Sequence, residues 1–79
     1  MNKRKDIIPN KLREYRLKSG LTQKQVAQKL GVNNEERVCH WEKGRNAPNF
    51  INLMKLCKLY NTEPQALYTE LDLLKPESI

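Results

Sequence analysis

Apolar side chains recur along this chain every three or four residues, the spacing that places them on one face of an α-helix. The pattern predicts five helical segments, over residues 7–19, 22–30, 34–43, 50–60 and 64–74. Gly20, Gly31 and Gly44 close the first three segments and Asn61 closes the fourth, because glycine and asparagine tolerate the left-handed conformation. No long stretch alternates with the two-residue period of a strand. The sequence therefore predicts an all-α fold, a compact bundle of five short helices.

Residues at the predicted helix starts support this assignment. Thr22 and Gln25 have the spacing of a capping box, and Asn34 and Asn49 precede the third and fourth segments as N-caps. The side chains expected to face the interior are Ile8, Leu12, Tyr15, Val26, Ala27, Leu30, Val38, Trp41, Phe50, Leu53, Leu56, Cys57, Tyr60 and Leu67. In the last segment Leu71 and Leu74 continue the spacing of Leu67.

The chain has 79 residues, with 15 Lys and Arg against 9 Asp and Glu, a net charge of +6. This length allows one small domain with a thin core. Residues 1–29 carry nine basic and two acidic side chains, whereas residues 62–79 carry one basic and four acidic ones. Such a basic pole fits a polyanion, most simply nucleic acid, with the acidic end turned away from it. An unevenly charged solvated surface is the alternative interpretation.

Composition excludes several classes of function. Cys39 and Cys57 are too few for a disulfide framework and are expected to be reduced thiols. With one histidine and no ligand spacing, neither a metal site nor another cofactor is expected. No nucleophile stands beside a base, so we do not expect an enzyme. No apolar run approaches the roughly 20 residues of a membrane span, and we expect a cytoplasmic protein without a membrane partner.

The second and third segments have the features of a helix-turn-helix. Ala27 is the small residue where the two helices cross, and Gly31 supplies the turn. The surrounding signatures are Leu12-x3-Arg16-x3-Gly20-Leu21-Thr22-Gln23-x3-Ala27-x2-Leu30-Gly31-Val32, then Val38-x2-Trp41-Glu42-Lys43-Gly44-x3-Pro48. With these motifs, residues 12–68 resemble the lambda-repressor-like DNA-binding domain of the Xre/Cro family. The resemblance implies a five-helix domain that binds operator DNA, usually as a dimer, with its third helix in the major groove.

One spacing departs from the family pattern. The turn glycine and the Glu of the Glu-x-Gly motif are eleven residues apart here, one more than is usual in the family. Counted without a shift, Arg37 and His40 would occupy the inward positions of the third helix. A shift by one residue places Val38 and Trp41 there instead, which avoids burying a guanidinium and an imidazole. We therefore predict one extra residue in the turn, within residues 32–34.

In that register, the resemblance implies base-reading positions at Glu35, Glu36 and His40, with Arg37 beside them. The two carboxylates also suit the positive end of the helix dipole. A carboxylate that faces DNA can accept a hydrogen bond from cytosine N4, so both interpretations stay open. Arg37 either reaches a phosphate or a guanine or offsets the charge of the two glutamates.

Other residues are candidates for phosphate contacts and for internal pairing. The phosphate candidates are Thr22, Gln23, Lys43, Arg45, Asn46, Lys3, Arg4 and Lys5. The first two lie at the start of the second helix, where free N–H groups accept a phosphate. The next three follow the third helix, and the last three form a basic N-terminal arm, alternatively a disordered terminus. The resemblance also implies a structural ion pair between Arg16 and Glu42.

These observations predict a basic arm (1–6), a helix-turn-helix DNA-binding domain (7–70) and a C-terminal tail (71–79). The predicted function is a sequence-specific DNA-binding transcriptional regulator, of the small phage-repressor or mobile-element type, which reads double-stranded DNA with residues 34–43. The alternative is a protein-interaction module, such as an anti-repressor or antitoxin-like partner. We expect a homodimer on a palindromic operator.

The predicted dimer contact uses the leucines of the tail. Leu71, Leu73 and Leu74 come later than the domain needs and have no obvious core to enter. Apolar side chains at that density suggest a surface for a second copy. The competing interpretation is that the tail folds back as a lid over the thin core.

Overall fold

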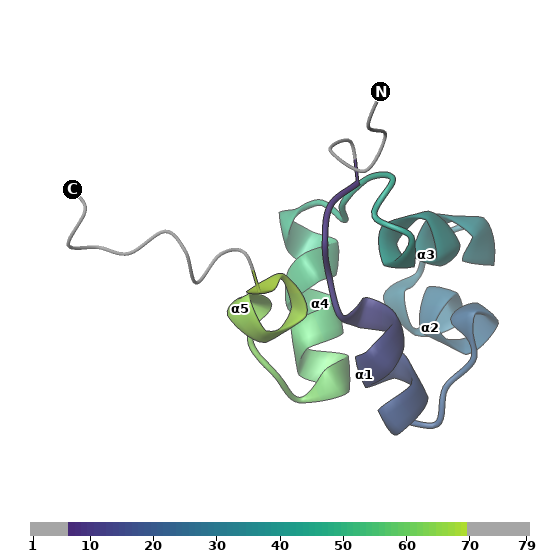
Figure 1. Ribbon diagram of the computed structural model, residues 1–79. Coiled ribbons are helices and arrows are strands. Elements are labelled where there is room, and N and C mark those ends of the chain that lie inside the picture. Colours follow the sequence, from purple (N-terminus) through teal and green to yellow (C-terminus); the bar gives the residue numbers. More distant parts are fainter. Residues whose placement is uncertain (1–6, 70–79) are drawn as a thin grey trace, which may run out of the picture.

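Residues 7–69 are described by the computed structural model, and within them the chain folds into helices without a strand (Figure 1). The helices are α1 (Leu12–Lys18), α2 (Gln23–Leu30), α3 (Glu35–Glu42), α4 (Phe50–Tyr60) and α5 (Pro64–Leu67). Figure 1 shows α2 and α3 on one side of the molecule and α4 and α5 on the other, with α1 in front. The predicted all-α bundle of five helices is confirmed.

Local signals determine where the middle helices begin and end. The Thr22 hydroxyl accepts a hydrogen bond from the Gln25 amide and the Gln25 side chain accepts one from the Thr22 amide, which completes the predicted capping box. Asn34 and Asn49 cap α3 and α4 through their side-chain oxygens. Gly31 ends α2 in the left-handed conformation, as expected. These bonds satisfy backbone groups that a short helix otherwise leaves unpaired.

The core lies where the five helices meet. Each helix contributes one side chain that is at most 2% exposed: Leu12, Val26, Val38, Leu56 and Leu67. Two contacts hold α5, the shortest helix, in place. The Leu67 side chain is buried in the core, and the Leu67 carbonyl accepts a hydrogen bond from the Lys11 backbone amide at 2.8 Å. Burial of these side chains removes apolar surface from water, the main stabilising contribution in a domain of this size.

The first helix begins later than the pattern predicts. The Ile8 amide donates to the Gly44 carbonyl at 2.8 Å, and the Asn10 side chain donates to the Trp41 carbonyl at 3.1 Å. These bonds hold residues 7–11 against the end of α3, so that they do not become helical. Ile8 is exposed, and the prediction that it extends the apolar stripe of Leu12 is wrong.

Two further expectations about apolar positions are corrected. Phe50 is 70% exposed, although its spacing assigns it to the buried stripe of α4. Phe50 lies with the exposed Ile51 on the solvent side of the first turn of α4, whereas Leu53 packs against the core. The last helix ends at Leu67 because Tyr68 leaves the helical conformation, so the predicted continuous helix to residue 74 is wrong. Leu71, Leu73 and Leu74 lie outside the described residues.

Tyr60 and Tyr68 are buried at the edge of the core. Burial raises the pKa of Tyr68 to about 12. Burial, with a contribution from Glu42, also raises the pKa of Tyr60. Both phenols are therefore neutral at pH 7, and their rings are structural rather than exposed for base stacking. The Tyr68 hydroxyl is buried without a hydrogen-bond partner among the described residues.

Replacing Tyr68 by phenylalanine is expected to keep the fold. The change removes an unpartnered polar atom, so stability at pH 7 should stay equal or rise by about 1 kcal/mol. The folded phenol holds its proton more tightly than the unfolded one, whose pKa is 10.0. Its contribution to stability is therefore present below pH 10 and lost as the pH rises toward 12. Urea unfolding of both proteins between pH 7 and 12 should show a shallower alkaline loss for the variant, and parallel curves would contradict this.

Candidate nucleic-acid interface

The orientation of α3 determines which side chains reach the surface. Val38 and Trp41 are buried, at 2% and 3% exposure, whereas Glu36 and Arg37 are exposed. This confirms the register with one extra residue in the turn. The turn accommodates that residue because Gly31 is left-handed, Val32 is partly buried against the core and the Asn34 cap starts the helix.

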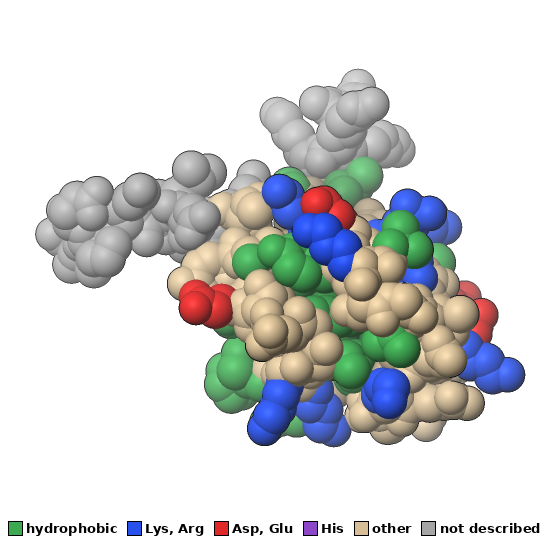
Figure 2. Space-filling model, turned by 90° about the horizontal axis from the view of Figure 1, so that it is seen from below, with side chains coloured by type: hydrophobic (Ala, Val, Ile, Leu, Met, Phe, Trp, Pro, Cys, Tyr) green, Lys and Arg blue, Asp and Glu red, His purple; other side chains and the backbone are tan. Residues whose placement is uncertain are grey.

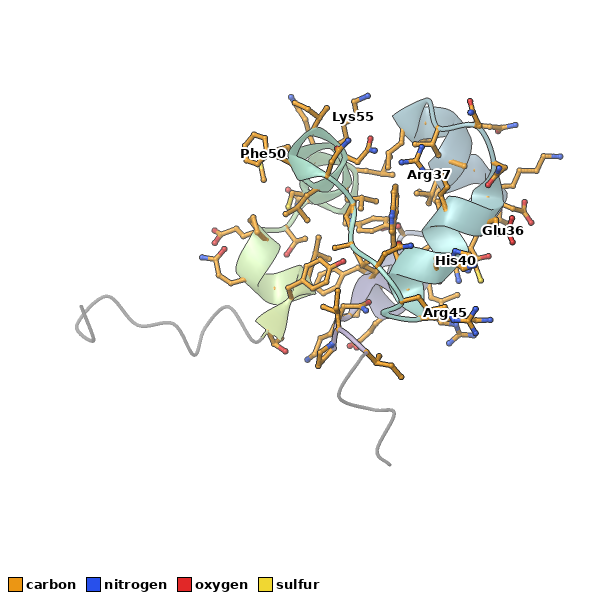
Figure 3. The ribbon with its side chains drawn as sticks, turned by 90° about the horizontal axis from the view of Figure 1, so that it is seen from above. Glu36, Arg37, His40, Arg45, Phe50 and Lys55 are labelled. Carbon is orange, nitrogen blue, oxygen red and sulfur yellow. The ribbon has the colours of Figure 1, made fainter. Side chains whose placement is uncertain are left out.

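The outer side of α3 carries a line of polar side chains. Figure 3 shows Glu36, His40 and Arg45 following one another along α3 and the loop after it. The His40 Nε2 atom lies 4.0 Å from a carboxylate oxygen of Glu36, one helical turn away. Glu35 is also exposed in the first turn. A single row of donors and acceptors on one side of a helix is the arrangement that can meet the edges of bases in a groove.

Arg37 points to a different side of α3 from His40 (Figure 3). Its guanidinium lies 5.8 Å from the centre of the Trp41 ring, within range of a cation–π interaction. The charged end of Arg37, an exposed residue, therefore lies over the ring of the buried Trp41. This contact, rather than neutralisation of the neighbouring glutamates, is the one that the structure assigns to Arg37.

An ion pair connects α1 to the end of α3. Arg16 Nε donates to Glu42 Oε2 at 2.6 Å, and Arg16 Nη2 donates to Glu42 Oε1 at 3.2 Å. The two side chains are only 10% and 3% exposed, and Arg16 also donates to the Leu21 carbonyl. The hydrogen bond to Glu42 raises the pKa of the Arg16 guanidinium above its ordinary value. The pair thus ties α1, the start of α2 and α3 together.

Gln23 belongs to the same network. Its side-chain amide donates to Glu42 Oε1 at 2.9 Å. The resemblance implies that Gln23 contacts a phosphate. In the structure its side-chain nitrogen instead donates to the Glu42 carboxylate. Thr22, the other candidate at this helix start, uses its hydroxyl oxygen as the N-cap. This end of α2 can therefore bind a phosphate mainly through its backbone N–H groups and the helix dipole.

The loop after α3 presents cationic and polar side chains. Lys43, Arg45 and Asn46 are exposed, whereas Gly44 between them is buried against the segment that precedes α1. The backbone amide of Arg45 donates to the His40 carbonyl, which fixes the loop to the last turn of α3. The predicted arm of Lys3, Arg4 and Lys5 lies outside the described residues.

Sequence reasoning missed two polar contacts that hold α2 and α3 in place. Asn10 donates to the Ile8 and Trp41 carbonyls, and its side-chain oxygen accepts from the Leu12 amide. Lys55 on α4 donates to the Leu30 carbonyl at the end of α2, at 3.0 Å. An asparagine two residues before a helix is a local signal, because its side chain can bond to the backbone two positions on. The lysine contact joins residues 25 positions apart in the chain, and no local pattern indicates it.

The remaining surface is less organised. Figure 2 shows the face opposite to that of Figure 3, where Lys and Arg side chains are spread among polar and apolar ones. Within residues 7–69, no three His, Cys, Asp or Glu side chains gather as a metal site would require. Every helix of this part of the chain is too short or too polar to cross a membrane.

Comparison with known proteins agrees with this geometry. The chain is 33% identical over 58 residues to an uncharacterized HTH-type transcriptional regulator of Archaeoglobus fulgidus, which covers 73% of this chain and 81% of that protein. It is 37% identical over 60 residues to the HTH-type transcriptional regulator ImmR of Bacillus subtilis, of whose length it spans 46%. The crystal structure of the restriction-modification controller protein C.AhdI from Aeromonas hydrophila superposes with a TM-score of 0.64 at 31% identity, over 73% of this chain and 83% of that one.

A family match covers most of the described chain. The helix-turn-helix family matches residues 12–67, from the first residue of α1 to the last of α5. The matched stretch includes the α2–α3 pair and the Arg16–Glu42 ion pair that holds it. The chain therefore belongs to the lambda-repressor-like helix-turn-helix family.

Proposed function

We propose that this protein is a DNA-binding transcriptional regulator that reads a specific sequence by placing α3 in the major groove. The observation that carries the proposal is the orientation of α3, with Val38 and Trp41 buried and Glu36 and His40 on its outer side. A helix presented in this way by a second, crossing helix fits the width of the groove. Two relatives named as transcriptional regulators and a structurally similar controller protein support the regulatory role.

The contacts divide into two kinds. Lys43, Arg45 and Asn46, with the N-terminus of α2, would hold the phosphates on the two sides of the groove. Glu35, Glu36 and His40 would meet base edges, a glutamate accepting from cytosine N4. Arg37 would contribute its positive charge from its position over the Trp41 ring. The basic arm of residues 1–6 would add further phosphate contacts.

We further propose that two copies bind a palindromic operator together. A single reading helix specifies too few base pairs to single out one site in a genome. A two-fold pair doubles the length of the site and repeats the same contacts. A regulator of this kind needs neither a cofactor nor an enzymatic activity. It would act in the cytoplasm, where its DNA lies.

Selection of bound duplexes from a random DNA library tests this function directly. The expected result is one enriched sequence with two-fold symmetry. The affinity for it should fall by orders of magnitude from low to moderate salt, because phosphate contacts release counterions. No enrichment, together with weak salt dependence, would favour the alternative of a protein-interaction module whose acidic residues Glu35 and Glu36 meet another protein.

His40→Ala is expected to change base preference at one position of each half-site. Loss of a direct base contact reduces discrimination there by about 1–3 kcal/mol. Library selection repeated with the variant measures this preference. Glu63→Ala, an exposed change before α5, is the control and should leave the selected sequence unchanged. An unchanged consensus for His40→Ala would remove His40 from the reading surface.

Arg45→Ala is expected to weaken binding equally on the selected and on random DNA. The Arg45 side chain is exposed in the loop after α3, where a phosphate contact carries no base information. The slope of log affinity against log salt should become shallower by about one. Fluorescence titrations at several salt concentrations measure both quantities. An altered base preference would instead assign Arg45 to base reading.

A further inference from the structure

The outer face of α4 is apolar although it faces solvent. Phe50, Ile51 and Met54 are 70%, 59% and 36% exposed. They lie on consecutive turns of one side of the helix, and Lys55 and Lys58 border the same side. Figure 3 shows Phe50 pointing outward from α4, away from the other helices. The Lys55 ammonium lies at the border toward α2, where it donates to the Leu30 carbonyl at 3.0 Å. This α4 face thus combines an apolar centre with a cationic edge.

The position of α4 in the bundle does not depend on these exposed apolar side chains. The buried side of the same helix holds Leu56 and Tyr60, so α4 is anchored without its outer side chains. The other large exposed apolar side chains among residues 7–69, Ile7, Ile8 and Leu17, belong to α1 and the segment before it. Three neighbouring exposed apolar side chains on one helix therefore mark the α4 face as a surface for a partner.

We propose that the α4 face binds the acidic, leucine-rich segment 70–74 of a second copy of this chain. That segment reads Glu-Leu-Asp-Leu-Leu and follows directly on the last described residue, Thr69. Its leucines match the apolar centre of the α4 face, and its two carboxylates match Lys55 and Lys58. The inference rests on the proposed pairing of two copies on DNA and names the contact that pairs them.

Charge argues for this occupant over direct packing of two α4 faces. Two such faces in contact would bring the Lys55 and Lys58 pairs of both copies together, and like charges in an interface are unfavourable. The acidic segment supplies the opposite charge. Leu67 and the hydrogen bond from Lys11 fix α5, the last described helix before this segment, beside α4. Each copy would place its segment 70–74 on the α4 face of the other, so the contact is made twice, as a two-fold interface requires.

Cysteine cross-linking tests which chain supplies the segment. One full-length variant carries Ile51→Cys, a second and larger tagged variant carries Leu73→Cys, and both carry Cys39→Ser to remove a partly exposed thiol. Mixed and oxidised on library-selected DNA, they are expected to form a disulfide between the two chains. Leu17→Cys, an exposed apolar position on α1, replaces Ile51→Cys in the control and should not cross-link.

Two results would overturn the inference. In a single chain that carries both cysteines, closure into a disulfide-bonded monomer would show that the segment covers its own α4. Absence of any disulfide while DNA binding persists would show that the contact does not exist. The same cross-linking is repeated without DNA at high protein concentration. A cross-link that forms there, while the unsubstituted protein selects no DNA sequence, would count against the proposed function and not against this contact.

A charge exchange gives an independent measurement of the same contact. Lys58→Glu is expected to raise the concentration at which the full chain dimerises by about tenfold, and adding Asp72→Lys should restore it. Analytical ultracentrifugation measures the dimer in each case. Lys18→Glu, an exposed position on α1, is the matched control and should leave dimerisation unchanged. Failure of the double variant to recover would contradict the pairing of these two charges.

Discussion

Replacing Glu42 by alanine is expected to lower the free energy of unfolding by about 3–5 kcal/mol. The change removes the only carboxylate that pairs with Arg16 in the described part of the chain, and it leaves the guanidinium buried without its counter-charge. The Gln23 amide loses its acceptor as well. A small domain is stable by only about 5–15 kcal/mol, so this loss is a large fraction of its total stability. Urea denaturation followed by circular dichroism measures the loss.

Two comparisons separate this effect from a general loss of charge. Glu36→Ala removes a carboxylate from the exposed side of the same helix and should change stability by less than about 0.5 kcal/mol. The double change Arg16→Met and Glu42→Met replaces both charges with apolar groups and should be less destabilising than Glu42→Ala alone. If the double variant is the less stable of the two, the pair itself, rather than an orphaned charge, accounts for the loss.

Gly44→Ala is expected to be the second most damaging change, at about 2–5 kcal/mol. Gly44 has a φ of +76°, which strains any residue with a side chain. A Cβ atom there would lie 2.5 Å from the Ile8 carbonyl oxygen and 2.9 Å from the Ile8 nitrogen. These are backbone atoms, and the Ile8 amide is hydrogen-bonded to the Gly44 carbonyl. The segment before α1 therefore has to move away from α3 to make room for the Cβ atom.

Gly20→Ala provides the matched control for this prediction. Gly20 has nearly the same φ, +73°, but no atom lies within 4 Å of the position that its Cβ would take. It should therefore lose only the conformational contribution, about 1–2 kcal/mol. Thermal unfolding of the two variants measures the difference between them. Equal losses would show that backbone conformation alone, and not the packing of residues 7–11 on the loop after α3, makes glycine necessary.

Gly44 also connects stability to the proposed DNA contacts. The same loop carries Lys43, Arg45 and Asn46, and its position depends on the close approach of Ile8. Displacement of that contact in Gly44→Ala should move three phosphate candidates at once. The loss of DNA affinity should therefore exceed that of Arg45→Ala, even at temperatures where the variant is fully folded.

Local chemistry made much of this fold predictable. The bounds of α2, α3 and α4 follow from Thr22, Asn34 and Asn49 at their starts and from Gly31 and Asn61 at the ends of α2 and α4, because capping involves residues a few positions apart. The register of α3 was predictable for a different reason. Burial of two apolar side chains is so much more favourable than burial of a guanidinium and an imidazole that only one alignment was reasonable.

Contacts between distant parts of the chain decided the rest. Periodicity alone extended the first helix to residue 7, whereas hydrogen bonds from Ile8 and Asn10 to the end of α3 hold this segment in a non-helical conformation. Phe50 has the spacing of a core residue, but whether a neighbouring helix covers it depends on how α4 lies in the bundle. Periodicity identifies one side of a helix, and only the packed structure determines how much of that side is covered.

The candidate interface divides in the same way. The sequence by itself determined that a helix-turn-helix is present and which residues its third helix presents, since composition, caps and apolar spacing all lie within that short stretch. Only the tertiary structure decided that Gln23 bonds to Glu42 and that Arg37 lies over Trp41. A long polar side chain has several partners within reach, and the choice among them depends on distances that the folded chain alone sets.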